Sequence, residues 1–342
     1  MESVLVGLSG GVDSAVSVRL LQEQGYRVHG TFLSFCSESD PEPAARLAQA
    51  LGISFSVVED EKGFEKKVIR PFVDSFCRAE TPNPCVVCNR AMKIPALLRE
   101  ADRLGMDKVA TGHYARIERE AGRFCLYRGR DENKDQSYFL WKLTQRQLSR
   151  LIFPLSRWEK QKARDLARDL MPQEEKESME ICFIPNGDTA GFVDARGGKT
   201  PSGDFVDRFG RVLGRHHGIS HYTIGQRRGL GVAMGERWFV TDLLPENNQV
   251  VLGPADELLC QEIWVESLHF VSMSRKTIPA EGIVMQGRHR GKRIPCQVLW
   301  QEGGARVLLS EPYRRFAPGQ SACFYLGDKL LFGGIIGKSS LF

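Results

Sequence analysis

Two cysteines three residues apart are the first residues in this sequence whose types and spacing could do chemistry. Cys85 and Cys88 lie in the stretch TPNPCVVCNR, residues 81–90, directly after a turn with two prolines. Such a pair can be a structural pair, a metal clip or part of a reactive centre, because the thiolate is both a nucleophile and a metal ligand. Spacing alone leaves these three interpretations open.

A glycine-rich loop near the N-terminus predicts a phosphate site. GLSGGVDS, residues 7–14, lies between an apolar run and a segment with helical character, where free backbone N–H groups and the helix dipole favour an anion. The two glycines let the backbone approach a phosphate closely, and Ser9 and Ser14 can donate hydroxyls. The loop lacks a Walker lysine and the dinucleotide fingerprint. A turn without a ligand is the alternative, which the full SGGVDS string in this context disfavours.

An alternation of strands and helices must position these residues. Apolar, β-branched runs predict strands at 3–8, 27–33, 53–60 and 107–112, and helical patterns occupy 14–24, 41–51, 64–77 and 95–104. This order predicts a parallel sheet with helices on both faces. The signal from 134 to 171 is mainly helical. Beyond residue 195, glycine-rich turns and short alternating runs predict a small middle module and then a β-barrel.

Length and composition set the class of protein. A chain of 342 residues suggests two or three domains, and a formal charge of +5 tolerates a polyanionic partner without demanding one. No apolar run approaches the ~20 residues of a membrane span, and no secretory signal is visible. Nine scattered cysteines are unlike a disulfide framework. We therefore expect a cytoplasmic protein without a membrane partner.

Motifs along the whole chain resemble one family. SGGVDS resembles the pyrophosphatase-type loop of enzymes that use ATP to place AMP on an acceptor. Further segments resemble the tRNA-specific 2-thiouridylases, in a variant with NPCxxC where the more familiar motif has NPDxxC. These segments are TPNPCVVCNR, ATGHYAR (110–116), KDQSYFL (134–140), SMEICFIP (178–185), HYTIGQRRGLG (221–231), RHRGKRIPC (288–296) and APGQSACFY (317–325).

The resemblance implies a fold and an activity. The fold class would be α/β, with a doubly wound parallel sheet of the adenine nucleotide alpha-hydrolase (PP-loop ATPase) type over residues 1–195. A central tRNA-binding domain would follow over 196–262, and a β-barrel over 263–342. The enzyme would use ATP and Mg²⁺ to adenylate O2 of uridine 34 in the tRNA anticodon, and sulfur would then displace AMP to give 2-thiouridine. A sulfur-donor protein or sulfide would be the second partner, and DNA is not expected.

The resemblance also implies site residues. ATP would be held by Gly7, Leu8, Ser9, Gly10, Gly11, Val12, Asp13, Ser14, Leu33 and Gly112. The tRNA would be contacted by Asn83, Pro84, Cys85, His113, Lys134, Asp135, Gln136, Arg288, His289 and Gln320. Each group has a plainer interpretation. His113 could be a hydrogen-bonded core histidine, the DQS turn could cap the next helix, and the basic run from Arg288 could be a solvated face.

The cysteines leave several mechanisms open. By resemblance Cys88 is the catalytic thiol and Cys182 receives a persulfide sulfur, whereas Cys85 replaces the Asp of the more familiar motif. Three cysteines also resemble the ligand set of a 4Fe-4S cluster with one open iron, as in related thiolation enzymes. We keep four alternatives: a cluster on Cys85, Cys88 and Cys182, persulfide chemistry with Cys85 as helper, a zinc site, or an inert pair. The other six cysteines are expected to be ordinary thiols.

Two other functions remain compatible with the sequence. The same loop serves other adenylating synthetases, which would not need Cys88 or Cys182. A nucleotide- or cluster-sensing RNA-binding protein without turnover is the second alternative. Formation of 2-thiouridine from tRNA, ATP, Mg²⁺ and a sulfur source separates both from a sulfurtransferase.

Overall fold

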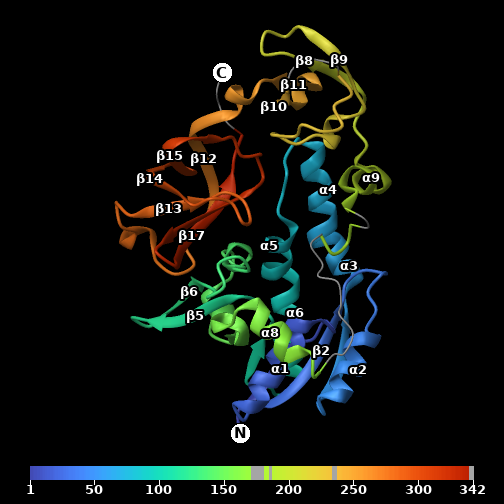
Figure 1. Ribbon diagram of the computed structural model, residues 1–342, viewed down its shortest axis with the longest axis vertical. Coiled ribbons are helices and arrows are strands. Elements are labelled where there is room, and N and C mark those ends of the chain that lie inside the picture. Colours follow the sequence, from blue (N-terminus) through green and yellow to red (C-terminus); the bar gives the residue numbers. More distant parts are fainter. Residues whose placement is uncertain (171–180, 185–186, 233–236, 339–342) are drawn as a thin grey trace.

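The chain folds into three parts that follow one another in sequence. The computed structural model describes residues 1–170, 181–184, 187–232 and 237–338. Figure 1 shows an α/β part in blue and green, a small β-sheet part in yellow at the opposite end from α1 and α2, and a barrel in orange and red beside them. Among the described helices none is long and apolar enough to cross a membrane.

The N-terminal part is built on a five-stranded parallel sheet. Its strands are β1 (Ser3–Gly7), β2 (Arg27–Ser34), β3 (Ser54–Glu59), β4 (Lys108–Ala110) and β7 (Leu151–Ile152). Their order is β3-β2-β1-β4-β7, and all the pairings are parallel. The predicted doubly wound sheet is therefore confirmed. The order reverses between β1 and β4, which is where open α/β sheets bind ligands.

Helices cover both faces of this sheet because the strand residues alternate. Val4 and Val6 of β1 pack in one core with α1 (Val12–Glu23) and α2 (Glu42–Ala50). Leu5 points to the other face and packs in a second core with α6 (Ile94–Arg103). Burial on both faces explains why the strand sequence is a continuous apolar run.

Two longer helices contain a wide π-helical turn directly before a proline. The first runs through α3 (Glu61–Phe64), η1 (Glu65–Ile69) and α4 (Arg70–Cys77), and the second through α5 (Pro84–Cys88), η2 (Asn89–Lys93) and α6. Pro71 and Pro95 lie just after the wide turns. A proline inside a helix removes one hydrogen bond and crowds the carbonyl four residues earlier, and a wider turn relieves that crowding.

The second of these helices begins earlier than the sequence pattern predicted. The expected helix started at Pro95, whereas the structure starts it at Pro84, so Cys85 and Cys88 lie in its first turns. Proline is favourable at the first helical position because its missing N–H has no helical partner there. The double proline of TPNP therefore marks a helix start.

The mainly helical prediction for 134–171 is confirmed over Lys160–Ala167 and wrong for the stretch SYFLWKL, where only Ser137–Phe139 form a short 3-10 turn. The described residues form short pieces: η3 (Ser137–Phe139), α7 (Gln145–Leu148), β7, η4 (Pro154–Arg157) and α8 (Lys160–Ala167). The apolar residues of SYFLWKL are instead buried in a core that includes Cys323, Tyr325 and Leu330 of the barrel. Their hydrophobicity reflects burial against another domain and not a helical face.

The C-terminal part is a six-stranded closed barrel. Its strands are β12 (Leu259–His269), β13 (Ile283–Gln286), β14 (Ile294–Gln301), β15 (Gly304–Arg314), β16 (Ser321–Leu326) and β17 (Lys329–Ile336). Pairing between β12 and β17 closes it. The hairpin β5 (Ala115–Glu120) and β6 (Arg123–Arg128), from the N-terminal part, extends the same sheet through β17. The predicted barrel is confirmed.

The middle part is a four-stranded sheet with its own core. Its strands are β8 (Gly203–Val206), β9 (Val212–His216), β10 (Phe239–Leu244) and β11 (Gln249–Gly253), in the order β10-β11-β8-β9. The short helical pieces of this part of the sequence are α9 (Thr189–Val193), η6 (Asp194–Gly198), η7 (Ile219–His221), η8 (Pro245–Asn247) and η9 (Ala255–Leu258). A further short turn, η10 (Arg275–Thr277), belongs to the barrel and lies between β12 and β13.

Trp141 joins the N-terminal part to the barrel, which makes it a test of this fold. Its side chain is fully buried, and its indole N–H donates to Ser321 Oγ at 3.0 Å. A Cβ added to Gly333 would lie only 2.6 Å from the ring, so no gap separates ring and strand. We expect Trp141→Ala to lower the free energy of unfolding by about 3–5 kcal/mol, because it leaves a cavity and an unpaired hydroxyl.

The matched control is Phe209→Ala, which removes an aromatic ring that is 77% exposed. It should change the free energy of unfolding by no more than about 0.5 kcal/mol. Denaturant titration followed by fluorescence measures both variants. Equal stability of the two variants would contradict the role given to Trp141.

Candidate active site

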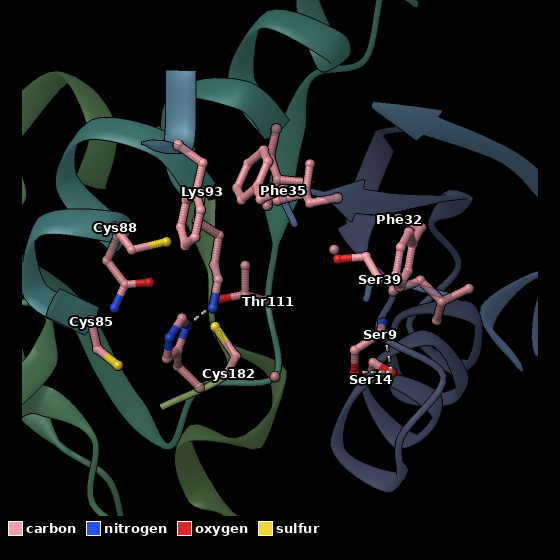
Figure 2. Close-up of a pocket in the computed structure, with 18 of the residues that line it drawn as sticks. Ser9, Ser14, Phe32, Phe35, Ser39, Cys85, Cys88, Lys93, Thr111 and Cys182 are labelled. Carbon is pink, nitrogen blue, oxygen red and sulfur yellow. Dashed lines mark hydrogen bonds between the residues drawn. The ribbon is translucent and has the colours of Figure 1, made fainter. Parts of the chain in front are cut away.

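The carboxyl ends of β1, β2 and β4 open into a cavity of about 550 Å³. Figure 2 shows Ser9 and Ser14 of the glycine-rich loop on one side of it and Cys85 and Cys88 on the other, with Lys93, Thr111 and Cys182 between. Of the sequence-predicted residues, the cavity collects Gly7, Leu8, Ser9, Asp13, Ser14, Leu33, Pro84, Cys85, Cys88, Gly112, His113, Gln136 and Cys182. The loop and the cysteines thus belong to one site.

The glycine-rich loop has the geometry of an anion site. Gly10 has φ +86°, and a Cβ there would lie 3.0 Å from Pro43 Cβ, so both conformation and space require glycine. Ser14 Oγ donates to the carbonyl of Gly11 at 2.8 Å and thereby holds the turn. Gly11 is the N-cap of α1, and no side chain caps that helix. The first N–H groups of α1 are therefore open to a phosphate.

Asp13 of the loop is tied to two residues from far along the chain. Lys160 Nζ lies 2.8 Å from both carboxylate oxygens of Asp13, and the hydroxyl of Tyr114 donates to Oδ1 at 2.8 Å. Lys160 itself is buried. This buried ion pair fixes the Asp13 carboxylate at the base of the loop, so α8 helps to hold the loop although no sequence motif marked it.

Gly112 follows β4 and lies against the loop from the other side. A Cβ at this position would be 3.0 Å from Asp13 Cβ and 3.1 Å from the Asp13 carbonyl carbon. The absence of a side chain therefore lets β4 and the phosphate loop approach each other. This supports a steric role for Gly112 in shaping the nucleotide site.

Cys85 and Cys88 face the cavity from the first turns of their helix (Figure 2). Burial raises the pKa of both thiols, and the positive charge of Lys93 lowers it. A hydrogen bond from the backbone N–H of Lys93 further lowers the pKa of Cys88. Burial has the larger influence on the pKa, so both side chains are protonated thiols at neutral pH. The charge of Lys93 favours their deprotonation to thiolates.

Cys182 reaches the same cavity from a separate segment. Cys182 is exposed to solvent. Neighbouring protein atoms nevertheless desolvate its thiol, and this raises its pKa to about 11. The nearby thiols of Cys85 and Cys88 add to that rise, and Lys93 opposes it. All nine cysteines are free. The flanking Ser178–Glu180 and Pro185 of the predicted motif lie outside the described residues.

Among the residues that the structure describes, no group of three His, Cys, Asp or Glu side chains is placed to hold a single metal ion. Cys85, Cys88 and Cys182 belong to those residues and line one cavity. A zinc site on these cysteines is therefore not supported. The 4Fe-4S cluster on the three cysteines stays a prediction.

Lys93 is a functional candidate that sequence reasoning missed. In a regular α-helix a residue five positions after Cys88 would be rotated by about 140° from it. The wide turn η2 instead brings Lys93 onto the cavity side, where it lines the cavity together with Cys88. No described carboxylate pairs with its ammonium. A cation that faces buried thiols without a counter-ion is suited to stabilising a thiolate.

Cys36 also lines the cavity, although it was expected to be an ordinary thiol. Its Sγ lies 3.2 Å from Ser39 Oγ, and its charge influences the pKa of Cys182. Nothing in the spacing of Cys36 relates it to the other three cysteines. Only the folding of β2 toward the same opening brings it there.

His113 is buried at the cavity wall, as its plainer interpretation had it. Thr111 Oγ1 and His113 Nδ1 lie 2.7 Å apart, and the ring packs edge-on against Phe153. Burial, helped by the charge of Lys93, lowers the pKa of His113 to about 3. His113 is therefore a neutral imidazole at ordinary pH, and it remains available to the cavity as a hydrogen-bonding group.

The predicted tRNA contacts of the 134–136 turn separate into different environments. Asp135 is buried, and its carboxylate accepts hydrogen bonds from the N–H groups of Gly129 and Ser137 and from Arg128 Nε. These are the bonds of a turn that leads into η3, so Asp135 shapes the backbone. Gln136 accepts from the N–H of Tyr114 at 3.1 Å and lines the cavity. Lys134 is half-buried.

The predicted tRNA contacts on the barrel, Arg288, His289 and Gln320, lie close to the cavity but do not line it. The ring of His289 lies 4.5 Å from that of Phe139, which does line it. Buried polar atoms without a partner among the described residues include Arg288 Nε, His289 Nδ1 and Gln320 Oε1. Buried unpaired polar atoms are rare unless a ligand or water satisfies them. Asn83 is the N-cap residue of α5, and its side chain makes no capping hydrogen bond.

Comparisons with known proteins cover nearly the whole chain. Residues 2–186 match the family described as tRNA methyl transferase HUP domain. Residues 190–254 match the tRNA methyl transferase PRC-barrel domain, and residues 260–336 match the aminomethyltransferase beta-barrel domain.

Curated relatives match over almost their full length. The tRNA-specific 2-thiouridylase MnmA of Carboxydothermus hydrogenoformans is 42% identical, with 98% of each chain covered. The enzyme of the same name from Clostridium botulinum is 38% identical over the same shares. Among solved structures, NMN synthetase from Francisella tularensis matches with a TM-score of 0.33 and 18% identity, over 49% of this chain and 61% of that one.

Gly112→Ala tests the steric role of this glycine. The added methyl group would press on Asp13 and displace the phosphate loop, so we expect the dissociation constant for ATP to rise about tenfold, equivalent to about 1.4 kcal/mol. Calorimetric titration with ATP measures the change. Thermal unfolding of the variant must match that of the unchanged chain, and an unaltered ATP affinity would contradict the assignment.

Lys93→Met tests the electrostatics of the thiols. Lys93 lowers the pKa values of Cys88 and Cys182, so its removal raises them and leaves less thiolate at any pH below those values. Alkylation of both cysteines by iodoacetamide should be slower in the variant. The pH at which the alkylation rate reaches half its maximum should be higher than in the unchanged chain. Peptide mass spectrometry reads each cysteine separately.

The control for this experiment is Lys162→Met, an exposed lysine on α8 paired with Glu159. It should leave the alkylation profiles unchanged. Identical profiles for Lys93→Met and the unchanged chain would refute the electrostatic role of Lys93.

Proposed function

Because the chain belongs to the tRNA-specific 2-thiouridylase family, we propose that its cavity is where ATP and uridine 34 of a tRNA anticodon react. The chain is an ATP-dependent tRNA sulfurtransferase that makes 2-thiouridine. The observation that carries the assignment of the site is that the phosphate loop and the thiols of Cys88 and Cys182 line one cavity. A reaction that needs both adenylation and sulfur can proceed only where the two meet.

The first step activates the base. Uridine O2 attacks the α-phosphorus of ATP, the bond to pyrophosphate breaks, and AMP remains attached to O2. The N–H groups at the start of α1 are arranged to stabilise the phosphates. Leu33 lines the cavity near the end of β2, and we assign it to packing against the adenine ring.

Mg²⁺ fits the chemistry of the same wall. It prefers oxygen ligands and is often held by one or two carboxylates together with substrate phosphates. Asp13 and Glu38 are the carboxylates that line the described cavity. When bound there, Mg²⁺ would neutralise triphosphate charge during pyrophosphate release.

The second step delivers sulfur. The outer sulfur of a persulfide on Cys182, supplied by a donor, attacks C2 of the adenylated uridine, and AMP leaves with the electrons of the C2–O2 bond. The Cys88 thiolate then attacks the inner sulfur, which releases 2-thiouridine and leaves a Cys88–Cys182 disulfide. An external thiol must reduce this disulfide before the next turnover. Lys93 assists because it favours the thiolate forms.

Cys85 has a different character from the Asp that stands there in the more familiar motif. Burial raises the pKa of Cys85, so this thiol is neutral and a weak hydrogen-bond donor, not a carboxylate. We propose that Cys85 forms part of the uridine pocket beside Pro84 and assists in positioning the base. General acid–base work by this residue would need a charge that the pocket disfavours.

Single cysteine substitutions test the mechanism. Purified chain with ATP, Mg²⁺, anticodon-containing tRNA and a persulfide donor should form 2-thiouridine. Cys88→Ser and Cys182→Ser should reduce its rate by at least about 100-fold, while pyrophosphate release on tRNA addition continues, because adenylation does not use the thiols. Cys125→Ser, a buried cysteine outside the cavity, is the control.

Two outcomes would contradict the proposal. Thiolation that persists in the Cys88→Ser, Cys182→Ser double variant would rule out the persulfide route through these two thiols. Thiolation that requires bound iron and is lost in Cys85→Ser would replace the persulfide route. Iron analysis of the protein purified without oxygen decides the second point.

A further inference from the structure

The loop of residues 223–231, TIGQRRGLG, is a built structure whose charged residues the site described above does not use. It connects η7 to β10 in the middle part of the chain. Gly225, Gly229 and Gly231 have φ values of +88°, +74° and +67°, a region that favours glycine. A Cβ at Gly225 or Gly231 would meet nothing within 4 Å. These glycines therefore serve the path of the backbone and do not make room for packing.

Gln226 clamps this loop. Its side-chain oxygen accepts from the N–H of Thr223 at 3.1 Å, and its side-chain nitrogen donates to the carbonyl of Arg228 at 3.1 Å. The loop is also paired with β10, since Gly225 N–H donates to the Val240 carbonyl and Val240 N–H to the Gln226 carbonyl. A loop held at its base and across its tip presents its side chains in a defined arrangement.

Arg227 and Arg228 project from this clamp and are exposed. Neither has an ion-pair partner among the residues that the structure describes. The arginines of the neighbouring hairpin differ, because each is paired: Arg208 with Glu257 at 3.4 Å, Arg211 with Asp207 at 2.7 Å and Arg215 with Asp204 at 2.9 Å. Two adjacent guanidinium groups without an internal anion are suited to an external one.

The base of the loop is connected to the entrance of the uridine pocket. Thr81 Oγ1 donates to Thr223 Oγ1 at 3.3 Å. Thr81 lies three residues before Pro84 of the cavity wall, and three residues of chain span at most roughly 11 Å. An RNA whose uridine occupies the cavity therefore comes within reach of this loop.

We propose that Arg227 and Arg228, held by Gln226, bind backbone phosphates of the tRNA whose uridine enters the cavity. The partner is an RNA phosphate backbone, because two adjacent unpaired guanidinium groups match phosphate oxygens, and a backbone offers one phosphate at every nucleotide. The inference rests on the proposed function, which supplies the RNA. It adds a contact that orients the substrate without touching the reacting atoms.

Salt-dependent binding tests this proposal. Arg227→Gln together with Arg228→Gln should weaken tRNA binding roughly tenfold at moderate salt and reduce the slope of log affinity against log salt concentration by about two. The rate at saturating tRNA should stay unchanged. Gln226→Leu keeps the charges but loosens the clamp, so it should weaken binding with a slope close to that of the unchanged chain.

A charge-matched control removes two arginines elsewhere. Arg19→Gln with Arg46→Gln changes the net charge by the same amount on α1 and α2, where both arginines are exposed and paired with Glu23 and Glu42. These helices lie at the opposite end of the molecule from β10 and β11 (Figure 1). This control should leave the tRNA affinity and the slope nearly unchanged.

The outcomes separate the inference from the proposed function. If the unchanged chain makes no 2-thiouridine, the proposed function fails. If it does, but the Arg227, Arg228 double variant keeps its affinity and slope, the inference is overturned. It is also overturned if the double variant binds tRNA normally and loses only the rate supported by a donor protein, since the loop would then dock that protein.

Discussion

The geometry of the site depends on one proline inside a helix. In a regular α-helix Pro95 would lack one hydrogen bond and would crowd the carbonyl four residues earlier. The helix relieves this crowding with a wide π-helical turn at Asn89–Lys93. That widening places Lys93 on the same side as Cys88. A regular helix would turn the Lys93 ammonium away from the thiols. The reactivity of the cysteines is therefore linked to a backbone irregularity several residues away.

Around that helix the three parts of the chain meet in a small region. Thr81, just before the helix, donates its N–H to the Pro318 carbonyl of the barrel segment and its hydroxyl to Thr223 of the middle part. Gly319 has φ +88° and packs against Thr81 with no room for a side chain. Thr81 therefore ties both β parts to the start of the helix that carries Cys85 and Cys88.

Much of this could be predicted from local sequence. The strands of the parallel sheet, the loop 7–14, Gly112 and the positions of Cys88 and Cys182 follow from apolar runs, glycine spacing and motif resemblance, and the cavity unites them. The prediction failed where burial came from another domain. SYFLWKL has apolar residues at helical spacing, but Trp141 is buried against barrel strands and not along a helix.

The sequence by itself determined which chemical groups are present and which local turns they adopt, since glycine, proline and β-branched residues limit the backbone over a few residues. Only the tertiary structure decided which groups meet. Lys160 reaches Asp13 across 147 positions of sequence. Cys36 joins the cavity because β2 ends there, and Cys182 shares it with Cys85 and Cys88 although it comes from a separate segment. These placements depend on packing between distant segments, which no local pattern encodes.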